Sequence, residues 1–364
     1  METKKKIISY SLSSRSSRIE QLRQITDTLL RPDRDGEHND AVLKLHSLLS
    51  AISGLNNVPV DSSNYSNTVL AVGEAISPGD AARCVIDSVR TSKFLRGIYA
   101  ALLEAQRRFP NGPIEILYAG CGPFATLVIP LTTQFKADQI RFTLLDIHAR
   151  SLALARRTIE TLGLRDYARE YIQSDASVYV HPRPLHMVIT ETMQKALSKE
   201  PQVAITLKLA PQLCPSGIFI PERVTVDAYL GDPQKEYGLV IRDRDEFPSE
   251  TQRAGEARIK LGRVFELTAA TASELTRIVV KRRCFAEAYL QAAAIDLPKE
   301  IDEGLTLMLA TTMTVFGTIM LDEYESGLTH PLWFYDFSGA KRRGRIEFQY
   351  CLKDSPGFKW RMCA

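Results

Sequence analysis

Two glycines and two aspartates follow short apolar segments of this chain, in an order that suits a ligand carrying a ribose and an adenine. Gly120 and Gly122 come directly after the apolar segment 114–118, where a glycine turn lets the backbone approach a ligand closely. Asp146 ends the next apolar segment, and an acid there can accept hydrogen bonds from both ribose hydroxyls. Asp175 ends the third, where an adenine amino group could be bound.

The residues after Gly122 bear on the choice between two cofactors. A dinucleotide fingerprint would place its third glycine at Ala125, a substitution that such a fingerprint tolerates. Pro123, however, removes an N–H from the loop that would face a pyrophosphate. Because a cofactor without phosphates tolerates that loss, the sequence favours S-adenosylmethionine over a dinucleotide.

Strands and helices are expected to alternate around these residues. The segments 114–118, 141–145, 170–172 and 185–190 predict strands, and 149–162 predicts a helix. A further helical run is expected after the glycine turn. This alternation, with acids at strand ends, is typical of an α/β fold with a parallel, doubly wound sheet that binds ligands at the carboxyl ends of its strands.

The first part of the chain predicts helices. Apolar residues recur at helical spacing over 19–30 and 41–49, a polar, turn-rich piece spans 56–67, and Ser77 followed by Pro78 predicts a third helix start. That third helix is expected to turn five apolar side chains inward: Val85, Ile86, Val89, Phe94 and Ile98.

The last part of the chain predicts a mostly antiparallel β domain. Strands are expected at 224–230, 278–281, 305–321 and 345–351, with polar turns between them. The expected α/β architecture therefore has three parts: an N-terminal helical cap (1–110), a Rossmann-like cofactor-binding domain (111–221) and a C-terminal, antiparallel β-barrel-like domain (222–364).

The composition argues against several classes of protein. The 46 lysines and arginines nearly balance the 43 aspartates and glutamates, so a net charge of +3 gives no electrostatic case for nucleic-acid binding. No apolar h-region predicts a secretory signal, and the most apolar stretch, 305–321, holds five threonines and a glycine, which argues against a membrane span. The six cysteines form no pairing pattern, and His148, His181 and His186 show no metal spacing. We therefore expect a cytoplasmic protein with free thiols and no metal.

Five short motifs occur in order after residue 80. They are Asp87-Ser88-Val89-Arg90-Thr91 with Phe94, Tyr118-Ala119-Gly120-Cys121-Gly122, Glu191-Thr192-Met193 with Glu200, Leu213-Cys214-Pro215-Ser216-Gly217, and Thr329-His330. In this order and spacing the chain resembles class I S-adenosylmethionine-dependent methyltransferases, and the protein arginine N-methyltransferases in particular. The corresponding family features are the D-x-x-R-T-x-x-Y helix, the first glycine motif, the E-x-M-x6-E double-glutamate loop, the strand leading into the barrel, and the T-H-W loop.

The chain departs from that family at several positions. Tyr118 replaces the usual aspartate of the first motif, Pro123 follows the second glycine, and Pro331 stands where the family has tryptophan. No tyrosine-pair motif precedes the first strand, and about 80 N-terminal residues have no counterpart. These departures make free arginine or another small guanidine at least as good a candidate acceptor as a peptide arginine.

The resemblance implies a role for each site residue. Glu191 and Glu200 would hold the guanidinium, because two carboxylates can bind it through paired charge-assisted hydrogen bonds. Asp87 and His330 would shape the acceptor site, and we expect these two side chains to be in contact. The resemblance also implies a homodimer. The expected cofactor-binding residues are Arg90, for the methionine carboxylate, and Phe94, Tyr118, Gly120, Cys121, Gly122, Asp146, Ile147, Asp175, Ala176 and Met193.

Three functions follow from these observations. The leading one is an S-adenosylmethionine-dependent N-methyltransferase acting on free arginine, a small guanidine or a peptide arginine. The alternative keeps the cofactor but does not methylate, as in an azetidine-2-carboxylate synthase that releases methylthioadenosine, or an aminocarboxypropyl transferase. The third is a non-catalytic scaffold, against which the presence of both loop glutamates argues.

Overall fold

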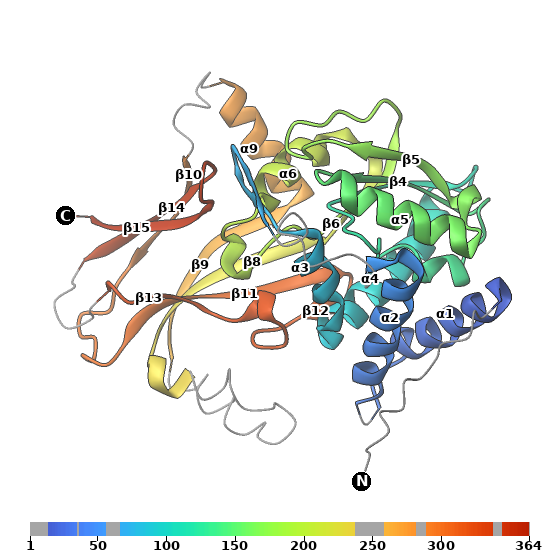
Figure 1. The fold of residues 1–364 in the computed structure, drawn as a ribbon. Helices are drawn as coiled ribbons and strands as arrows, with labels where there is room; N and C mark the ends of the chain where they lie inside the picture. The colour runs from blue at the N-terminus through green and yellow to red at the C-terminus, as the bar shows by residue number, and fades with distance from the viewer. Residues whose placement is uncertain are drawn as a thin grey trace, which may run out of the picture.

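The computed structural model describes residues 14–34, 36–55, 66–236, 258–281, 289–337 and 344–363. A parallel sheet flanked by helices forms one side of the protein, and antiparallel strands form the other (Figure 1). The α/β class with a parallel central sheet is therefore confirmed, whereas the three domain boundaries and a closed barrel stay predictions.

Five parallel strands form the central sheet in the order β5-β4-β3-β6-β7. The chain runs outward from β3 to β5, then returns to the other side of β3, so the strand order reverses at β3. Ligands of such sheets bind beyond the carboxyl ends of the strands at this reversal. The strands are β3 (Ile114–Ala119), β4 (Ile140–Asp146), β5 (Ala168–Gln173), β6 (Leu185–Thr190) and β7 (Leu213–Ile220).

The segment after the glycine turn does not form the helix expected there. Between β3 and β4 the structure has turns and a short 3-10 helix, η4 (Pro130–Thr133). Ala125 takes a left-handed conformation (φ 44°), and Pro123 and Pro130 each lack the N–H that an α-helix interior needs. In contrast, α5 (Ala149–Leu162), between β4 and β5, begins and ends where the sequence predicted.

The two N-terminal helices cover this irregular segment. They are α1 (Arg15–Leu30) and α2 (Glu37–Ser53), and they pack against each other and against α5 (Figure 1). Gln134 Nε2, just after η4, donates to Asp27 Oδ1 of α1 over 2.8 Å. The first residue of α1, Arg15, donates to the last carbonyl of α5 over 3.0 Å. The N-terminal segment is therefore part of the same folded unit as the parallel sheet.

The predicted third helix is broken into two. Ser77 caps α3 (Pro78–Arg83) as expected, but a 3-10 turn follows and Asp87 starts a new helix, α4 (Ser88–Arg108). The break arises because the Asp87 carboxylate accepts the N–H of Arg90 and caps α4, which a residue inside a continuous helix could not do. Of the five side chains predicted to face inward, Val85, Phe94 and Ile98 are buried, Val89 is partly buried, and Ile86 is 41% exposed.

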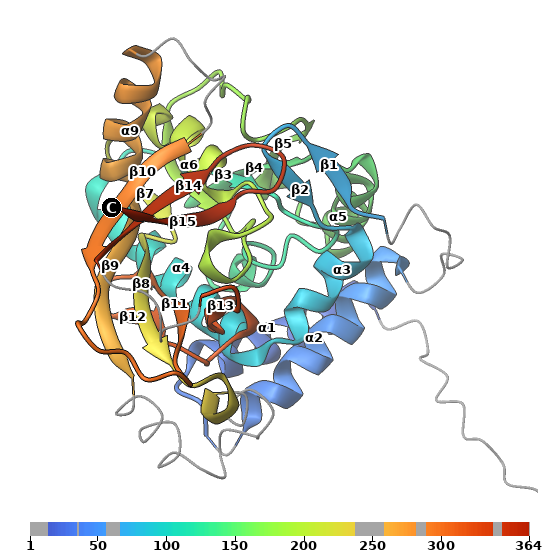
Figure 2. The same cartoon turned by 90° about the vertical axis from the view of Figure 1, so that its left-hand side faces the viewer.

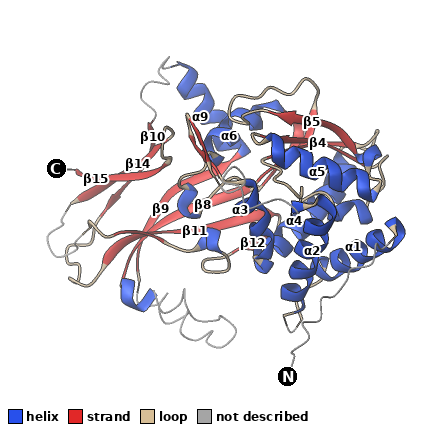
Figure 3. Ribbon diagram, in the orientation of Figure 1, coloured by secondary structure: helices blue, strands red, loops and turns tan. Residues whose placement is uncertain are grey.

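The remaining strands form antiparallel sheets (Figure 3). One contains β8 (Arg223–Gly231), β9 (Ile259–Thr268), β11 (Thr306–Phe316), β12 (Ile319–Leu321) and β13 (Leu332–Phe334), and another contains β10 (Tyr289–Asp296), β14 (Arg345–Cys351) and β15 (Gly357–Cys363). A two-stranded hairpin, β1 (Thr68–Leu70) and β2 (Gly73–Ala75), precedes α3, and α6 (Gln202–Leu209) precedes β7.

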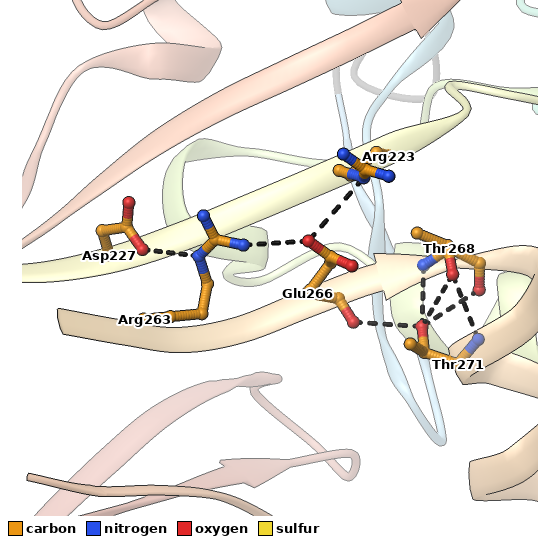
Figure 4. A network of polar contacts seen from close by, with 6 residues as sticks. All are labelled: Arg223, Asp227, Arg263, Glu266, Thr268 and Thr271. Atoms are coloured by element: carbon orange, nitrogen blue, oxygen red, sulfur yellow. Dashed lines mark hydrogen bonds and ion pairs between the residues drawn. The ribbon is translucent and has the colours of Figure 1, made fainter.

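The strand expected at 278–281 is wrong, because these residues end a helix, α9 (Ala269–Lys281). The helix begins directly after β9, where the hydroxyls of Thr268 and Thr271 each accept the other's backbone N–H (Figure 4). This reciprocal cap favours a helix over a continued strand. On the adjacent face of β8 and β9, Arg263 bridges the carboxylates of Asp227 and Glu266.

The described helices include none with the length and apolar character that a membrane span requires. The sequence signal for 305–321 resolves instead into β11 and β12, joined by a tight turn at Gly317 (φ 59°).

The packing of α2 predicts the effect of one core substitution. Leu45 is completely buried in α2, whereas Leu43 in the same helix is 50% exposed. Leu45→Ala should lower the free energy of unfolding by about 2–5 kcal/mol, because it leaves a cavity in a close-packed core. Chemical denaturation measures the change, with Leu43→Ala as the matched control expected within about 0.5 kcal/mol of the parent. Equal small effects would mean that α2 does not dock as described.

Candidate functional site

A pocket of about 540 Å³ lies at the carboxyl ends of the parallel strands. Its volume is in the ordinary range for small-molecule sites. The α3–α4 region, the β1–β2 hairpin and the loop before β13 complete its walls. The structure brings every predicted site residue except Asp87 to this pocket: Arg90, Phe94, Tyr118, Gly120, Cys121, Gly122, Asp146, Ile147, Asp175, Ala176, Glu191, Met193, Glu200 and His330.

The glycine turn after β3 requires both of its glycines. Gly120 and Gly122 have φ angles of +72° and +62°, a region that residues with a Cβ rarely adopt. A Cβ on Gly120 would lie 2.4 Å from Cγ2 of Thr192, which follows β6. Any larger residue would therefore push the turn away from the loop that carries Glu191.

Asp146 fixes the conformation of this turn. Its carboxylate is 5% exposed and accepts the N–H of Gly122 over 2.9 Å and that of His148 over 2.8 Å. The His148 ring lies 3.3 Å from the same carboxylate and 3.0 Å from the Thr68 hydroxyl on the β1–β2 hairpin. Each carboxylate oxygen has a second lone pair, so Asp146 can order the turn and still accept from a ligand hydroxyl. The contact from Thr68 through His148 was not foreseen in the sequence.

Asp175 lies beside Asp146 along the same edge of the sheet. Its Oδ1 accepts the N–H of Ser177 over 2.8 Å, and the N–H of Ser174 donates to the Asp146 carbonyl over 3.1 Å. The third strand end is thereby held close to the second. This arrangement places two acids along one wall of the pocket, as the strand order predicted.

A buried ion pair joins α4 to the end of β6. The guanidinium of Arg90 contacts the carboxylate of Glu191, and their side chains are 15% and 10% exposed. Burial opposes the charge of Arg90, but Glu191 more than offsets this and raises the Arg90 pKa. Burial raises the pKa of Glu191, and Arg90 opposes that rise. The second oxygen of Glu191, Oε1, is buried and has no hydrogen-bond partner in the described part of the chain.

Glu200 is a second buried acid in the same pocket. It is 5% exposed, and its pKa is raised to about 8, first by burial and then by the neighbouring charge of Glu191. Two carboxylates near each other in a low-dielectric pocket resist ionising together. Arg90 pairs with Glu191 alone, so a second cation bound in the pocket would stabilise the ionised form of Glu200.

The loop between these two glutamates has an unusual backbone. Ala196, Leu197 and Lys199 all have φ angles between 51° and 64°, where each side chain costs about 1–3 kcal/mol. Surrounding groups hold this conformation: Thr311 Oγ1 accepts the N–H of Ala196 over 2.9 Å, and Tyr350 Oη donates to the Leu197 carbonyl over 2.6 Å. Strain of this kind persists where the rest of the fold specifies it, and it often occurs at ligand sites.

Asp87 lies behind the pocket wall. Its Oδ1 caps α4, and its Oδ2 accepts the hydroxyl of Ser326 over 2.6 Å. Lys93 on the same helix pairs with Glu325. The cap helix and the loop carrying His330 are therefore tied through Ser326 and Glu325, while the expected contact between Asp87 and His330 itself stays a prediction. Tyr324 packs near His330 with ring centroids 6.2 Å apart.

No cluster of three or more histidine, cysteine, aspartate or glutamate side chains suited to a metal ion occurs within the described ranges. Two cysteines, Cys84 and Cys121, border the pocket, and burial raises the pKa of both thiols. Cys284 lies outside the described residues.

The fold of the chain is similar to that of solved structures. No protein-family model matches the chain, and no curated protein matches it. Among solved structures, a chain of the Trypanosoma brucei PRMT1 enzyme–prozyme heterotetrameric complex with AdoHcy is similar at 16% sequence identity and a TM-score of 0.46. The match covers 75% of this chain and 87% of the other.

The raised pKa of Glu200 predicts how stability depends on pH. In the unfolded chain this carboxyl ionises near its ordinary value, whereas in the fold it keeps its proton up to about pH 8. The folded state therefore binds more protons between about pH 4 and 8, and stability contributed by the protonated carboxyl is lost as pH rises. Relative to Glu200→Gln, the parent should lose up to about 1.4 kcal/mol of unfolding free energy per pH unit across this window.

Denaturant unfolding of both proteins from pH 5 to 8 measures this difference. Glu300→Gln removes an exposed carboxyl and serves as the control, for which the difference from the parent should stay flat. A constant difference between the parent and Glu200→Gln would contradict the buried, protonated Glu200.

Proposed function

We propose that this protein is an S-adenosylmethionine-dependent N-methyltransferase that acts on a guanidino group. The observation that carries the proposal is the pair of buried acids, Glu191 and Glu200, at the edge of a pocket that also contains a glycine turn and a strand-end aspartate. The turn and aspartate suit a nucleoside, and the acids suit a planar cation.

The residues present fit the cofactor. The Gly120–Gly122 turn presents backbone that a Cβ would block, and Asp146 retains acceptor capacity for ribose hydroxyls. Arg90 is the candidate for the methionine carboxylate, because its planar guanidinium can bind a carboxylate through two hydrogen bonds. When bound, S-adenosylmethionine supplies an electrophilic methyl group on a positively charged sulfur.

The two acids have distinct tasks in this proposal. The unpartnered Oε1 of Glu191 and the carboxylate of Glu200 would accept N–H groups from the guanidinium and hold it in one orientation. They would draw positive charge toward the nitrogens that they bind, which leaves the remaining nitrogen more nucleophilic. The surrounding low-dielectric pocket strengthens both effects because water does not screen them.

Methylation of a guanidinium nitrogen requires the loss of one proton. Glu200, which would ionise when it pairs with the guanidinium, is one candidate acceptor for this proton. His330 lies on the same pocket wall and is a second candidate acceptor. Asp87 is assigned a positioning role, because its two oxygens already accept from Arg90 and Ser326.

The non-methylating alternative accounts less well for the acids. A cyclisation of the cofactor uses its own amine and needs no second cation-binding group, so a buried pair of glutamates would have no ligand to neutralise. A homodimer stays a prediction from the sequence resemblance, and light scattering would test it.

Product analysis tests the function. The purified protein is incubated with S-adenosylmethionine, with and without arginine, and the products are followed by mass spectrometry. S-adenosylhomocysteine together with methylarginine supports the proposal. Methylthioadenosine without any acceptor supports the alternative, and cofactor binding without turnover supports a scaffold.

Glu200→Gln sharpens this test because it preserves shape and removes one charge-assisted hydrogen bond. Methyl transfer should fall about 10- to 150-fold, equivalent to about 1.5–3 kcal/mol, while calorimetric affinity for the cofactor changes little. Glu300→Gln, which alters an exposed acid, should leave turnover at the parental level. Undiminished turnover in Glu200→Gln would show that this acid does not hold the acceptor.

A further inference from the structure

Lys195 is a cation of this pocket that the proposed chemistry does not use. It lines the pocket at the start of the 3-10 helix η6 (Lys195–Leu197), within the loop between Glu191 and Glu200. Its side chain is partly buried, and its ammonium makes no hydrogen bond or ion pair with any residue that the structure describes. In contrast, the nearby cations Arg90 and Lys93 each contact a carboxylate.

The fold holds the backbone of this lysine in place. The next residue, Ala196, donates its N–H to the Thr311 hydroxyl on β11, and the Lys195 carbonyl accepts the Ser198 hydroxyl over 2.8 Å. The strained backbone that follows is fixed by Tyr350. Lys195 therefore borders the pocket from a loop that hydrogen bonds hold in place, so binding a ligand there would cost little further backbone entropy.

Two segments that are distant in sequence pack as a roof on the same loop. The β1–β2 hairpin meets the turn between β14 and β15, and both contact the loop between the glutamates (Figure 2). Glu74 N donates to the Lys199 carbonyl over 3.0 Å, and Lys199 N donates to the Pro356 carbonyl over 2.8 Å. A Cβ on Gly73 would lie 2.5 Å from the Lys199 carbonyl oxygen, so the hairpin and loop are in close contact.

The volume of the pocket bears on the size of the acceptor. Leu70, Ala75 and Ile76 from the hairpin region border the pocket on one side, and Gly327 and Leu328 border it on another. About 540 Å³ has to hold both the cofactor and the acceptor, and pockets of this size hold drug-sized ligands. This volume is compatible with the cofactor and a short acceptor bound together.

We propose that the acceptor is a free guanidino acid whose carboxylate is bound by Lys195. This rests on the proposed function, since Glu191 and Glu200 take the guanidinium at the other end of the same molecule. A molecule with a cation at one end and a carboxylate at the other pairs with the acids and with the unpartnered ammonium at once. Lys195 is thus a residue that determines specificity for acids over amines and capped peptides.

The test compares three ligands that share a guanidinium: L-arginine, its decarboxylated analogue agmatine, and a tripeptide with a central arginine and both termini blocked. Calorimetry is performed on protein saturated with S-adenosylhomocysteine. Arginine should bind at least tenfold tighter than agmatine or the blocked peptide, because only arginine offers a carboxylate to the ammonium.

Lys195→Met is the decisive variant, because it keeps most of the unbranched side chain and removes the ammonium and its charge. It should weaken arginine binding about 10- to 100-fold and should not weaken agmatine binding, because agmatine has no carboxylate for the lysine to bind. The matched control is Lys199→Met, which removes an exposed lysine of the same loop that does not line the pocket, and it should bind all three ligands like the parent. Affinity for S-adenosylmethionine should be the same in all three proteins.

Several outcomes would overturn this inference while leaving the proposed function intact. One is that the parent binds arginine and agmatine equally well and methylates both. Another is that it binds the blocked peptide more tightly than arginine. A third is that Lys195→Met loses affinity for arginine and for agmatine to the same extent. A tenfold loss of S-adenosylmethionine affinity in Lys195→Met would assign the lysine to the cofactor carboxylate instead. Failure of the parent to bind or methylate any of the three would overturn both proposals.

Discussion

The buried ion pair between Arg90 and Glu191 is the interaction around which the pocket is built. It joins the cap helix α4 to the carboxyl end of β6, and breaking it would leave an uncompensated buried charge at a cost of about 3–5 kcal/mol. Two features bring Arg90 and Glu191 together. Asp87 caps α4 one turn before Arg90, and β6 ends immediately before Glu191. Burial, and then the neighbouring charge of Glu191, raise the pKa of Glu200 to about 8. The local charge is balanced best when a cation enters.

The sequence predicted the parallel sheet well because its three central strands, β4, β3 and β6, are almost entirely buried and are rich in apolar residues. Acids at the ends of the parallel strands then had to meet at one edge, which is why Asp146, Asp175 and Glu191 line one pocket as expected. The helix start predicted at Ser77 depends on adjacent residues alone, and it is confirmed. The break at Asp87 was missed, since the apolar spacing continues across it and only the carboxylate's hydrogen bond to Arg90 ends the periodicity.

Other features depend on contacts between distant segments. The Thr268–Thr271 cap starts a helix that continues through 278–281, where the sequence pattern predicted a strand. After the glycine turn, the expected helix is absent and the short η4 segment packs under α1. Lys195 was visible within the double-glutamate loop, but a lysine in a loop is ordinarily solvated. In the fold it is partly buried and borders the pocket, and the β1–β2 hairpin and the β14–β15 turn, both distant in sequence, contact its loop. The role of Lys195 could therefore be inferred only from the three-dimensional structure.

Binding of a cation by Glu191 and Glu200 together should release a proton, and counting that proton is the most direct test. Calorimetric titration of arginine into the S-adenosylhomocysteine complex at pH 7, repeated in buffers with different ionisation enthalpies, counts the protons exchanged on binding. Because Glu200 has a pKa of about 8, it is mostly protonated before arginine arrives and must ionise to pair with the guanidinium. We expect release of close to one proton in the parent and none in Glu200→Gln. Binding without proton release in the parent would contradict binding of the cation by both acids.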